Sequence, residues 1–150
     1  MIQFRKASLD DLELLVALRI RDLKMFSKKP IQEETIHFIR QFYYQKILDQ
    51  QMITLLGYDQ EYLVASASLY QYQTMPSNEN PKGFVGQITN VWVHVNYRHQ
   101  GIASQMINEL IQQSRNQVGM ICLNASLQAI DLYKKCGFIK KENYFVKYNE

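Results

Sequence analysis

The chain has 150 residues, of which 47% are hydrophobic and 21% are charged. This length and composition predict a single domain over residues 1–150, and they exclude a disordered chain, a collagen-like chain and a disulfide scaffold. The formal net charge is +3, an excess too small to indicate a nucleic-acid-binding protein by itself.

The first half of the chain predicts one strand, two helices and two further strands. Ser8 followed by Asp11 resembles a capping box, which marks the start of a helix. Apolar side chains then recur at helical spacing in two stretches, and Lys28-Lys29-Pro30 separates them. The expected elements are a strand over residues 2–5, a helix after Ser8, a helix over residues 33–48, and strands over residues 52–58 and 62–72.

A strand over residues 84–95 follows a loop that contains two prolines and a glycine. One face of this strand carries three valines, Val91, Val93 and Val95. Ile88 is out of phase with them, and a β-bulge near Thr89 and Asn90 would produce this slip. A strand buried on both faces would produce the same pattern.

The last third of the chain predicts two more helices and three short strands. The helix over residues 101–117 has an apolar face opposite a face of Gln, Asn and Glu. Ser126 is expected to cap the second helix and Gly137 to end it. The strands are expected over residues 120–123, 138–140 and 144–148.

The junction between the strand at residues 91–95 and the helix at Gly101 predicts an anion site. The first turn of a helix presents unpaired N–H groups and a partial positive charge. Gly101 lacks a Cβ atom, so a phosphate group can approach the backbone, and Arg98 and His99 add donors nearby. A tight connection without a ligand would look the same, and the segment matches neither a Walker loop nor a dinucleotide fingerprint.

The residues of this junction also resemble a known family. Arg98-His99-Gln100-Gly101-Ile102-Ala103 matches the Arg/Gln-x-x-Gly-x-Gly/Ala signature of the GCN5-related N-acetyltransferases, the GNAT superfamily. Asn124 and the segment 129–138, which ends in Leu-Tyr-Lys-Lys-Cys-Gly-Phe, resemble the second landmark of that family. The element order resembles its β-αα-βββ-α-β-α-ββ plan over nearly the full length, although the first ninety residues match in pattern more than in motif.

The resemblance implies an α/β fold with a mixed, mostly antiparallel sheet flanked by helices. It implies a single N-acetyltransferase domain with acetyl-CoA as co-substrate and no metal. The backbone of the fourth strand would pair with the pantetheine arm, and the loop and helix start would cradle the pyrophosphate. The residues that would contact the cofactor are Val91, Trp92, Val93, Arg98, His99, Gln100, Gly101, Ile102, Ala103, Ser104 and Asn124.

Tyr133 is the catalytic candidate, because the resemblance places it where a phenol can protonate the departing CoA thiolate. A core tyrosine on an amphipathic helix is the alternative reading. Asn124 has the alternative of a turn or cap residue before Ser126. The Val93 backbone N–H is the expected donor to the developing oxyanion.

The general base is not evident from the sequence. His94 is interpreted as structural or solvent-facing. Glu33, Glu34 and His37 lie at or after the turn that borders the acceptor site in the family, and each also fits an exposed surface position. A chain of water molecules would serve equally well.

The function expected from the resemblance is direct transfer of an acetyl group to a primary amine of a small molecule. The alternatives are a CoA-binding module without turnover, transfer from another acyl-CoA, and a protein amine as acceptor. The resemblance places acceptor specificity in the first two helices and the variable loops, here around residues 24–34 and 73–82. The tail at residues 144–148 has three alternative roles: it would close the sheet, line the acceptor pocket or form the edge of a homodimer. The sequence does not distinguish between them.

The location expected from the sequence is the cytoplasm, with neither a membrane nor a nucleic acid as partner. No apolar run is long enough to span a membrane, and residues 1–6 show no apolar leader. Cys122 and Cys136 are therefore expected to be reduced, and neither is expected to carry an acyl group.

Overall fold

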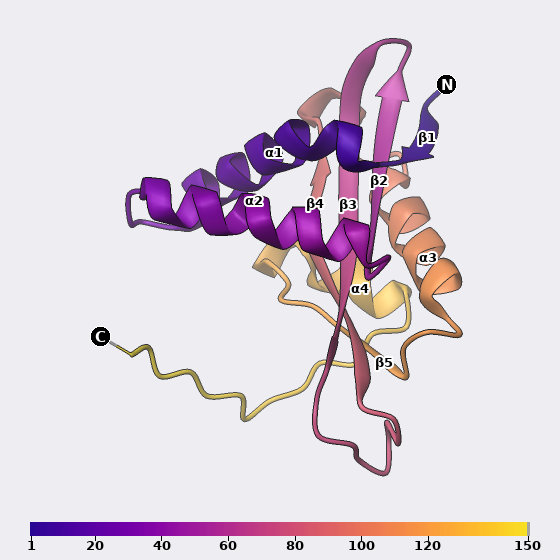
Figure 1. The fold of residues 1–150 in the computed structure, drawn as a ribbon. Coiled ribbons are helices and arrows are strands. Elements are labelled where there is room, and N and C mark those ends of the chain that lie inside the picture. Colours follow the sequence, from indigo (N-terminus) through magenta and orange to yellow (C-terminus); the bar gives the residue numbers. More distant parts are fainter. Residues whose placement is uncertain (150) are drawn as a thin grey trace.

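A five-stranded sheet forms the centre of the molecule in the computed structural model, which describes residues 1–149 (Figure 1). The strands lie side by side in chain order, and all neighbours are antiparallel except the last pair, which is parallel. The strands are β1 (Gln3–Lys6), β2 (Met52–Asp59), β3 (Tyr62–Gln73), β4 (Phe84–Val93) and β5 (Met120–Cys122). The predicted α/β fold with a mixed, mostly antiparallel sheet is therefore confirmed.

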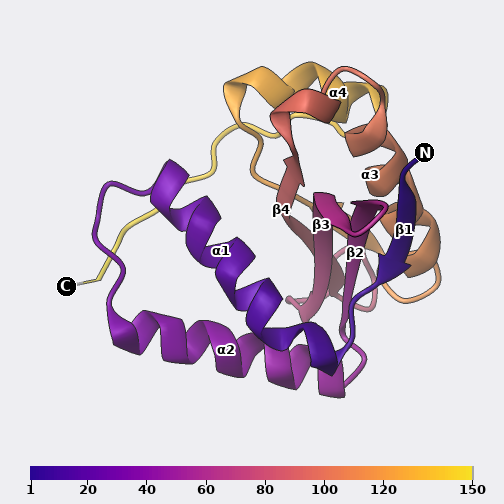
Figure 2. The same ribbon diagram turned by 90° about the horizontal axis from the view of Figure 1, so that it is seen from above.

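Four α-helices flank the sheet, two on each face. They are α1 (Leu12–Phe26), α2 (Glu33–Leu48), α3 (Ile102–Ser114) and α4 (Ile130–Lys135). Figure 2 shows α1 and α2 together on one face, with α3 and α4 on the other. The predicted capping box is present, because the Ser8 side chain and the Asp11 side chain both accept backbone N–H groups at the turn that precedes α1.

The hydrophobic core is divided by the sheet into two clusters. Leu56 packs with Leu15 and Tyr43 beneath α1 and α2. Its neighbour Leu55 packs with Leu110 on the face that α3 covers. Successive side chains of a strand point to opposite faces, so the run of buried residues in the centre of β2 and β3 supplies both clusters.

The predicted β-bulge is present in β4. Ser66 pairs with Trp92 while Ser68 pairs with Thr89, so two residues of β4 stand opposite Ala67. Asn90 takes up the extra residue with a φ of 54°, a left-handed conformation that asparagine tolerates better than most residues. The bulge brings Ile88 back into phase, so that it packs in the same cluster as Val91.

The strand at residues 84–95 is shorter than predicted. β4 ends at Val93, and Val95–Tyr97 form one turn of 3-10 helix. The side chain of Val95 is 65% exposed, so it does not share the buried face predicted for it. The ring of His94 caps this turn by accepting the N–H of Asn96 at 3.1 Å, which ends the strand.

The two closing strands predicted at residues 138–140 and 144–148 are wrong for the part of the chain that the structure describes. Residues 138–149 form no regular secondary structure, and Figure 1 shows them passing the lower part of the sheet and ending apart from it. Tyr144 and Phe145 are 84% and 89% exposed. Alternating apolar residues form a strand only where a sheet edge and a packing surface receive them, and the polar run before them includes Asn143 with a φ of 66°.

None of the helices in residues 1–149 has the length and apolar composition needed to cross a membrane.

Candidate active site

The loop between β4 and α3 has the geometry of an anion site. Gly101 caps α3 with a φ of 79°, and a Cβ atom built there would meet no atom within 4 Å. The glycine is therefore required by its left-handed backbone, and it faces open space. The N–H of Gln105 donates to the Gly101 carbonyl at 3.0 Å, so the first three N–H groups of α3 have no partner within the helix.

Arg98 braces this loop from the outside. Its Nε donates to the Val93 carbonyl at 3.0 Å, across the turn that joins β4 to α3. The side chain is exposed, as are His99 and Gln100. Because Nε is used in this hydrogen bond, it stabilises the shape of the loop. The two terminal nitrogens of Arg98 are left for the predicted phosphate contact.

The second half of β4 presents a free backbone edge. β4 and β5 are paired only at Val85, Gly86 and Gln87, and the two strands separate beyond this point. The His94 N–H donates to Val64 on β3 at 2.7 Å. Since N–H groups alternate in direction along an antiparallel strand, the N–H of Val93 faces the gap on the other side.

Tyr133 lies on the α3 face of the sheet, beside this edge. Its side chain is 8% exposed and belongs to the same cluster as Ile102, with Val91 and Val93 packed against it. Phe138 meets its ring edge-on at 5.9 Å. Burial, and to a smaller extent Cys136, raises the pKa of the Tyr133 phenol, so the hydroxyl stays protonated at neutral pH, the form that can donate a proton.

The other predicted polar residues lie at the rim. Asn124 is exposed two residues beyond β5, and its side chain has no hydrogen bond to any other residue of 1–149. Glu33, Glu34 and His37 are exposed in the first turns of α2. The structure therefore brings Val93, Gly101 and Tyr133 into one region and keeps the proposed bases apart from it.

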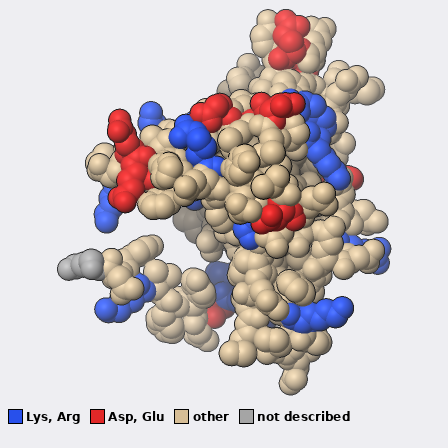
Figure 3. Space-filling model, in the orientation of Figure 1, with Lys and Arg blue, Asp and Glu red and all other residues tan. Residues whose placement is uncertain are grey.

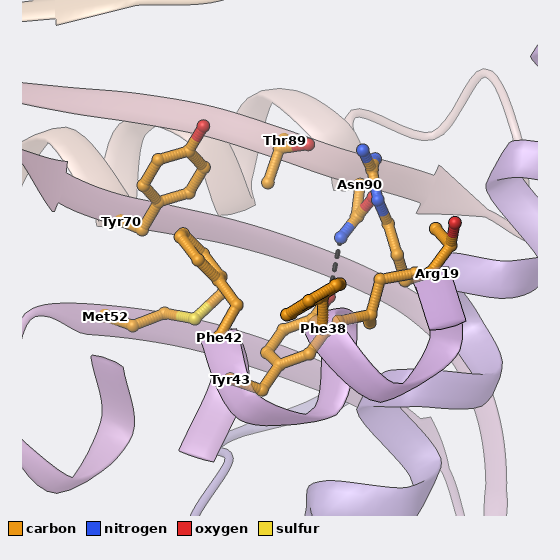
Figure 4. A pocket seen from close by; sticks show the side chains of 10 residues that line it. Arg19, Phe38, Phe42, Tyr43, Met52, Tyr70, Thr89 and Asn90 are labelled. Atoms are coloured by element: carbon orange, nitrogen blue, oxygen red, sulfur yellow. Dashed lines mark hydrogen bonds between the residues drawn. The ribbon is translucent and has the colours of Figure 1, made fainter. Parts of the chain in front are cut away.

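A pocket on the opposite face was missed by sequence reasoning. It has a volume of about 320 Å³ and lies between α1, α2 and the sheet (Figure 4). The residue ranges expected for acceptor specificity, 24–34 and 73–82, do not line this pocket. A signal existed in α2: Phe38 and Phe42 lie four residues apart on the helix, and they are 57% and 41% exposed. The lining residues are Arg19, Thr35, Phe38, Ile39, Phe42, Tyr43, Met52, Tyr70, Thr89 and Asn90.

The bulge residue Asn90 joins this pocket to both helices. Arg19 of α1 donates from Nη1 to Asn90 Oδ1 at 3.0 Å. The Asn90 Nδ2 group donates to the Tyr43 hydroxyl of α2 at 2.7 Å, the contact drawn as a dashed line in Figure 4. Burial raises the pKa of Tyr43 to about 12, so this hydroxyl stays neutral.

A cation and an aromatic ring meet where α1 crosses the end of β4. The Arg21 guanidinium carbon lies 3.8 Å from the centre of the Trp92 ring, within the range of a cation–π contact. The contact holds Trp92 on the α1 face, while Val91 and Val93 pack on the α3 face. After the bulge, the side chain of Trp92 therefore lies on one side of the sheet and those of Val91 and Val93 on the other.

Comparison with known proteins identifies the family. The model of the acetyltransferase (GNAT) family matches residues 17–138. This chain belongs to the acetyltransferase (GNAT) family. It is an N-acetyltransferase by class, and the predicted family is confirmed. A comparison with curated proteins gives no match.

Solved structures of acetyltransferases share this fold. A predicted acetyltransferase from Clostridium acetobutylicum, solved with acetyl-CoA, is 26% identical, with a TM-score of 0.90 over 99% of this chain and 96% of its own. A GCN5-related N-acetyltransferase from Ralstonia eutropha is 18% identical, with a TM-score of 0.81 over 99% of each chain. Glucosamine-6-phosphate N-acetyltransferase from Arabidopsis thaliana is 16% identical, with a TM-score of 0.72 over 100% and 99%.

The GNAT enzyme has a site whose residues fit acetyl-CoA. Phosphate groups need unpaired N–H donors and room near the backbone, and the start of α3 offers both at Gly101. An extended amide arm needs a free strand edge, which β4 offers from Ile88 to Val93. No group of His, Cys, Asp or Glu within residues 1–149 is arranged to hold a metal ion.

The two cysteines do not resemble acyl-carrying nucleophiles. Cys122 ends β5 and Cys136 follows α4, and both are half-buried. Burial raises the pKa of the Cys122 thiol, which lowers its thiolate fraction at neutral pH.

Proposed function

We propose that this enzyme moves an acetyl group from acetyl-CoA directly to a primary amine of a small molecule. The observation that carries the proposal is the buried, protonated phenol of Tyr133, which shares one hydrophobic cluster with Val91 and Val93 of β4 and with Ile102, the residue after Gly101. When bound, acetyl-CoA supplies the thioester: the neutral amine forms the C–N bond and gives up one proton to solvent, the C–S bond breaks, and the thiolate leaves with the electron pair.

Different residues are proposed to bind the cofactor and to assist the transfer of the acetyl group. The N–H groups of residues 98–104 hold the pyrophosphate, and the backbone of Val91, Trp92 and Val93 pairs with the pantetheine amides. The Val93 N–H, turned toward the gap, donates to the carbonyl oxygen as negative charge develops on it. Tyr133 gives its proton to the leaving sulfur, and Asn124 contacts the cofactor from the end of β5.

The partners proposed here follow the same reasoning. Figure 3 shows acidic and basic side chains interspersed over one face of the molecule, and the pocket of about 320 Å³ is of a size for a small molecule. These observations support a small-molecule acceptor, with neither a nucleic acid nor a membrane as partner.

The first test is cofactor binding by calorimetric titration of the wild-type chain with acetyl-CoA, CoA and dephospho-CoA. Binding at one site per chain is expected for acetyl-CoA and CoA. Weaker binding of dephospho-CoA would show that the protein contacts the 3′-phosphate, for which the candidates are Lys134, Lys135, Lys140, Lys141 and Lys147. A folded chain that binds none of the three would contradict the whole proposal.

The second test is the substitution Tyr133→Phe. It removes the proton donor, so kcat should fall roughly 10²–10⁴-fold, while affinity for CoA stays unchanged. Because burial raises the pKa of this phenol above its ordinary value of 10, the wild-type proton donor is lost only at higher pH. The matched control is Tyr62→Phe, since Tyr62 is 66% exposed at the start of β3.

An unchanged kcat in Tyr133→Phe would remove the residue from the mechanism. A wild-type chain that binds acetyl-CoA without acetylating any amine would indicate a CoA-binding module without turnover.

A further inference from the structure

The pocket between α1, α2 and the sheet is lined by positive charge only. Arg19 is the only charged residue among the ten that line it, and neither Asp nor Glu is among them. Lys46 adds a second cation at the rim, with its Nζ 5.8 Å from the centre of the Phe42 ring. The carboxyl of Asp22 is half-buried near Arg19 and Arg21 and lies outside the lining.

The guanidinium of Arg19 has capacity left for a ligand. Its one hydrogen bond to another residue of 1–149 goes from Nη1 to Asn90. A guanidinium carries five N–H donors in a planar fork that matches a carboxylate. Figure 4 shows the Arg19 side chain reaching from α1 to the Asn90 end of the pocket, so the Asn90 bond holds the fork in place.

The rest of the pocket is aromatic. Phe42 meets the Tyr70 ring edge-on at 5.0 Å, and Figure 4 shows Phe42 and Tyr70 at the other end from Arg19, with Phe38 between the two ends. The side chain of Phe38 is 57% exposed and that of Phe42 is 41% exposed. Exposed apolar surface of this kind gains free energy when a ligand covers it.

The pocket reaches the bulge of β4. The bulge residue Asn90 and its neighbour Thr89 line the inner wall of the pocket. Val91, the next residue, packs in the cluster that contains Tyr133 on the other side of the sheet. A molecule in this pocket would lie against the bulge, beyond the point where β4 parts from β5.

From this arrangement we infer that the acceptor is a small primary amine with one aromatic ring and one carboxylate, as in an aromatic α-amino acid. The carboxylate binds Arg19, and the ring lies against Phe42 and Tyr70. The volume of about 320 Å³ is near the lower end of ligand pockets, which run from about 300 to 1,000 Å³, and suits a single ring. Polyamines and aminoglycosides, which carry several positive charges, find no carboxylate in the lining. This inference rests on the proposed acetyl transfer.

The test compares four amines with the wild-type enzyme and acetyl-CoA, followed by release of the CoA thiol. Phenylalanine carries ring, amine and carboxylate; phenethylamine lacks the carboxylate; glycine lacks the ring; and spermidine is a polycation. Phenylalanine should have a kcat/KM roughly 10- to 100-fold above phenethylamine and glycine, because a charged hydrogen bond and a buried ring each contribute about that factor. Spermidine should be the poorest of the four.

The variant Arg19→Gln removes the charge and should lower kcat/KM for phenylalanine by roughly 10- to 100-fold while leaving phenethylamine unchanged. Phe42→Ala should affect phenylalanine and phenethylamine and spare glycine. The control is Arg40→Gln, on the same pair of helices and outside the pocket, where Arg40 pairs with Glu13 at 2.9 Å. Titration of phenylalanine into the CoA complex of the wild type and of Arg19→Gln measures the same contact without turnover.

Each outcome decides between the two proposals. If Arg19→Gln slows phenylalanine and phenethylamine equally, the charge does not select the carboxylate and the inference is wrong. It is also wrong if acetyl-CoA binds and spermidine or phenethylamine is the better acceptor, or if phenylalanine is not acetylated; the cofactor proposal then stands. If acetyl-CoA does not bind, the proposed function fails first.

Discussion

Asn90 shows how one side chain can serve fold and site together. Its backbone absorbs the extra residue of the bulge in a left-handed conformation. Its side chain bonds Arg19 of α1 and Tyr43 of α2, so both ends of the amide have partners. The bulge in β4 and the contacts of β4 with both helices thus involve the same residue.

Two substitutions of Asn90 separate these roles. Asn90→Gly keeps the conformation and removes both hydrogen bonds, which should lower the free energy of unfolding by about 1–3 kcal/mol because the Tyr43 hydroxyl is left buried without its partner. Asn90→Ala removes the same bonds and keeps a Cβ atom in the left-handed conformation without the asparagine amide that tolerates it, so this variant should be about 1–2 kcal/mol less stable than the Gly variant. Urea unfolding of the three proteins measures both steps, and equal stability of the Gly and Ala variants would contradict the strained conformation.

At the scale of the elements, the junction between β4 and α3 was predictable from the sequence, and the pocket between α1, α2 and the sheet was not. Gly101 stands in a contiguous motif, so its place at the start of a helix follows from local chemistry. The pocket gathers Arg19, Met52, Tyr70 and Asn90 from four elements, and no local pattern places them together. The bulge lies between these cases, since the phase slip near Asn90 indicated it and a strand buried on both faces would have looked the same.

Gly101 and Gly137 offer a matched pair for testing the junction. Both have a positive φ, of 79° and 95°, and a Cβ atom at either would meet no atom within 4 Å. Alanine at either position should therefore cost a similar free energy of folding, about 1–2 kcal/mol. Only Gly101→Ala places a methyl group at the proposed phosphate site, so it alone should weaken CoA binding, by roughly tenfold or more.

Calorimetric titration with CoA compares the two variants with the wild type. The same affinity for CoA in all three would show that the phosphate does not approach Gly101. A loss in both would indicate that CoA binding depends on general stability and not on the junction.

At the scale of the whole molecule, the sequence predicted the layers correctly and the end of the sheet wrongly. The order of helices and strands up to α4 follows from hydrophobic periodicity, and each face of the sheet has its helix pair. The last two strands had the same kind of pattern at residues 138–148. Whether such a segment pairs depends on the edge that receives it, and β5 is only three residues long.

This arrangement leaves two features unpaired within residues 1–149. β5 has β4 as its one neighbour in the sheet, so its outer edge is open, and open edges favour pairing with another chain. The tail beyond α4 carries exposed Ile139, Tyr144, Phe145 and Tyr148. An apolar segment and an open edge on the same chain favour exchange between two copies, with each tail lying against the sheet of its partner.

We therefore predict a homodimer whose formation requires the tail. Sedimentation velocity over a concentration series should show a dimer for the wild type, and the double substitution Tyr144→Ser with Phe145→Ser should shift it to the monomer. The control is Met25→Ser, which removes an apolar side chain that is 62% exposed at the end of α1, away from β5. If the wild type is monomeric and the double variant loses stability to urea, the tail packs on its own chain instead. If the double variant changes neither association nor stability, the tail contributes to neither.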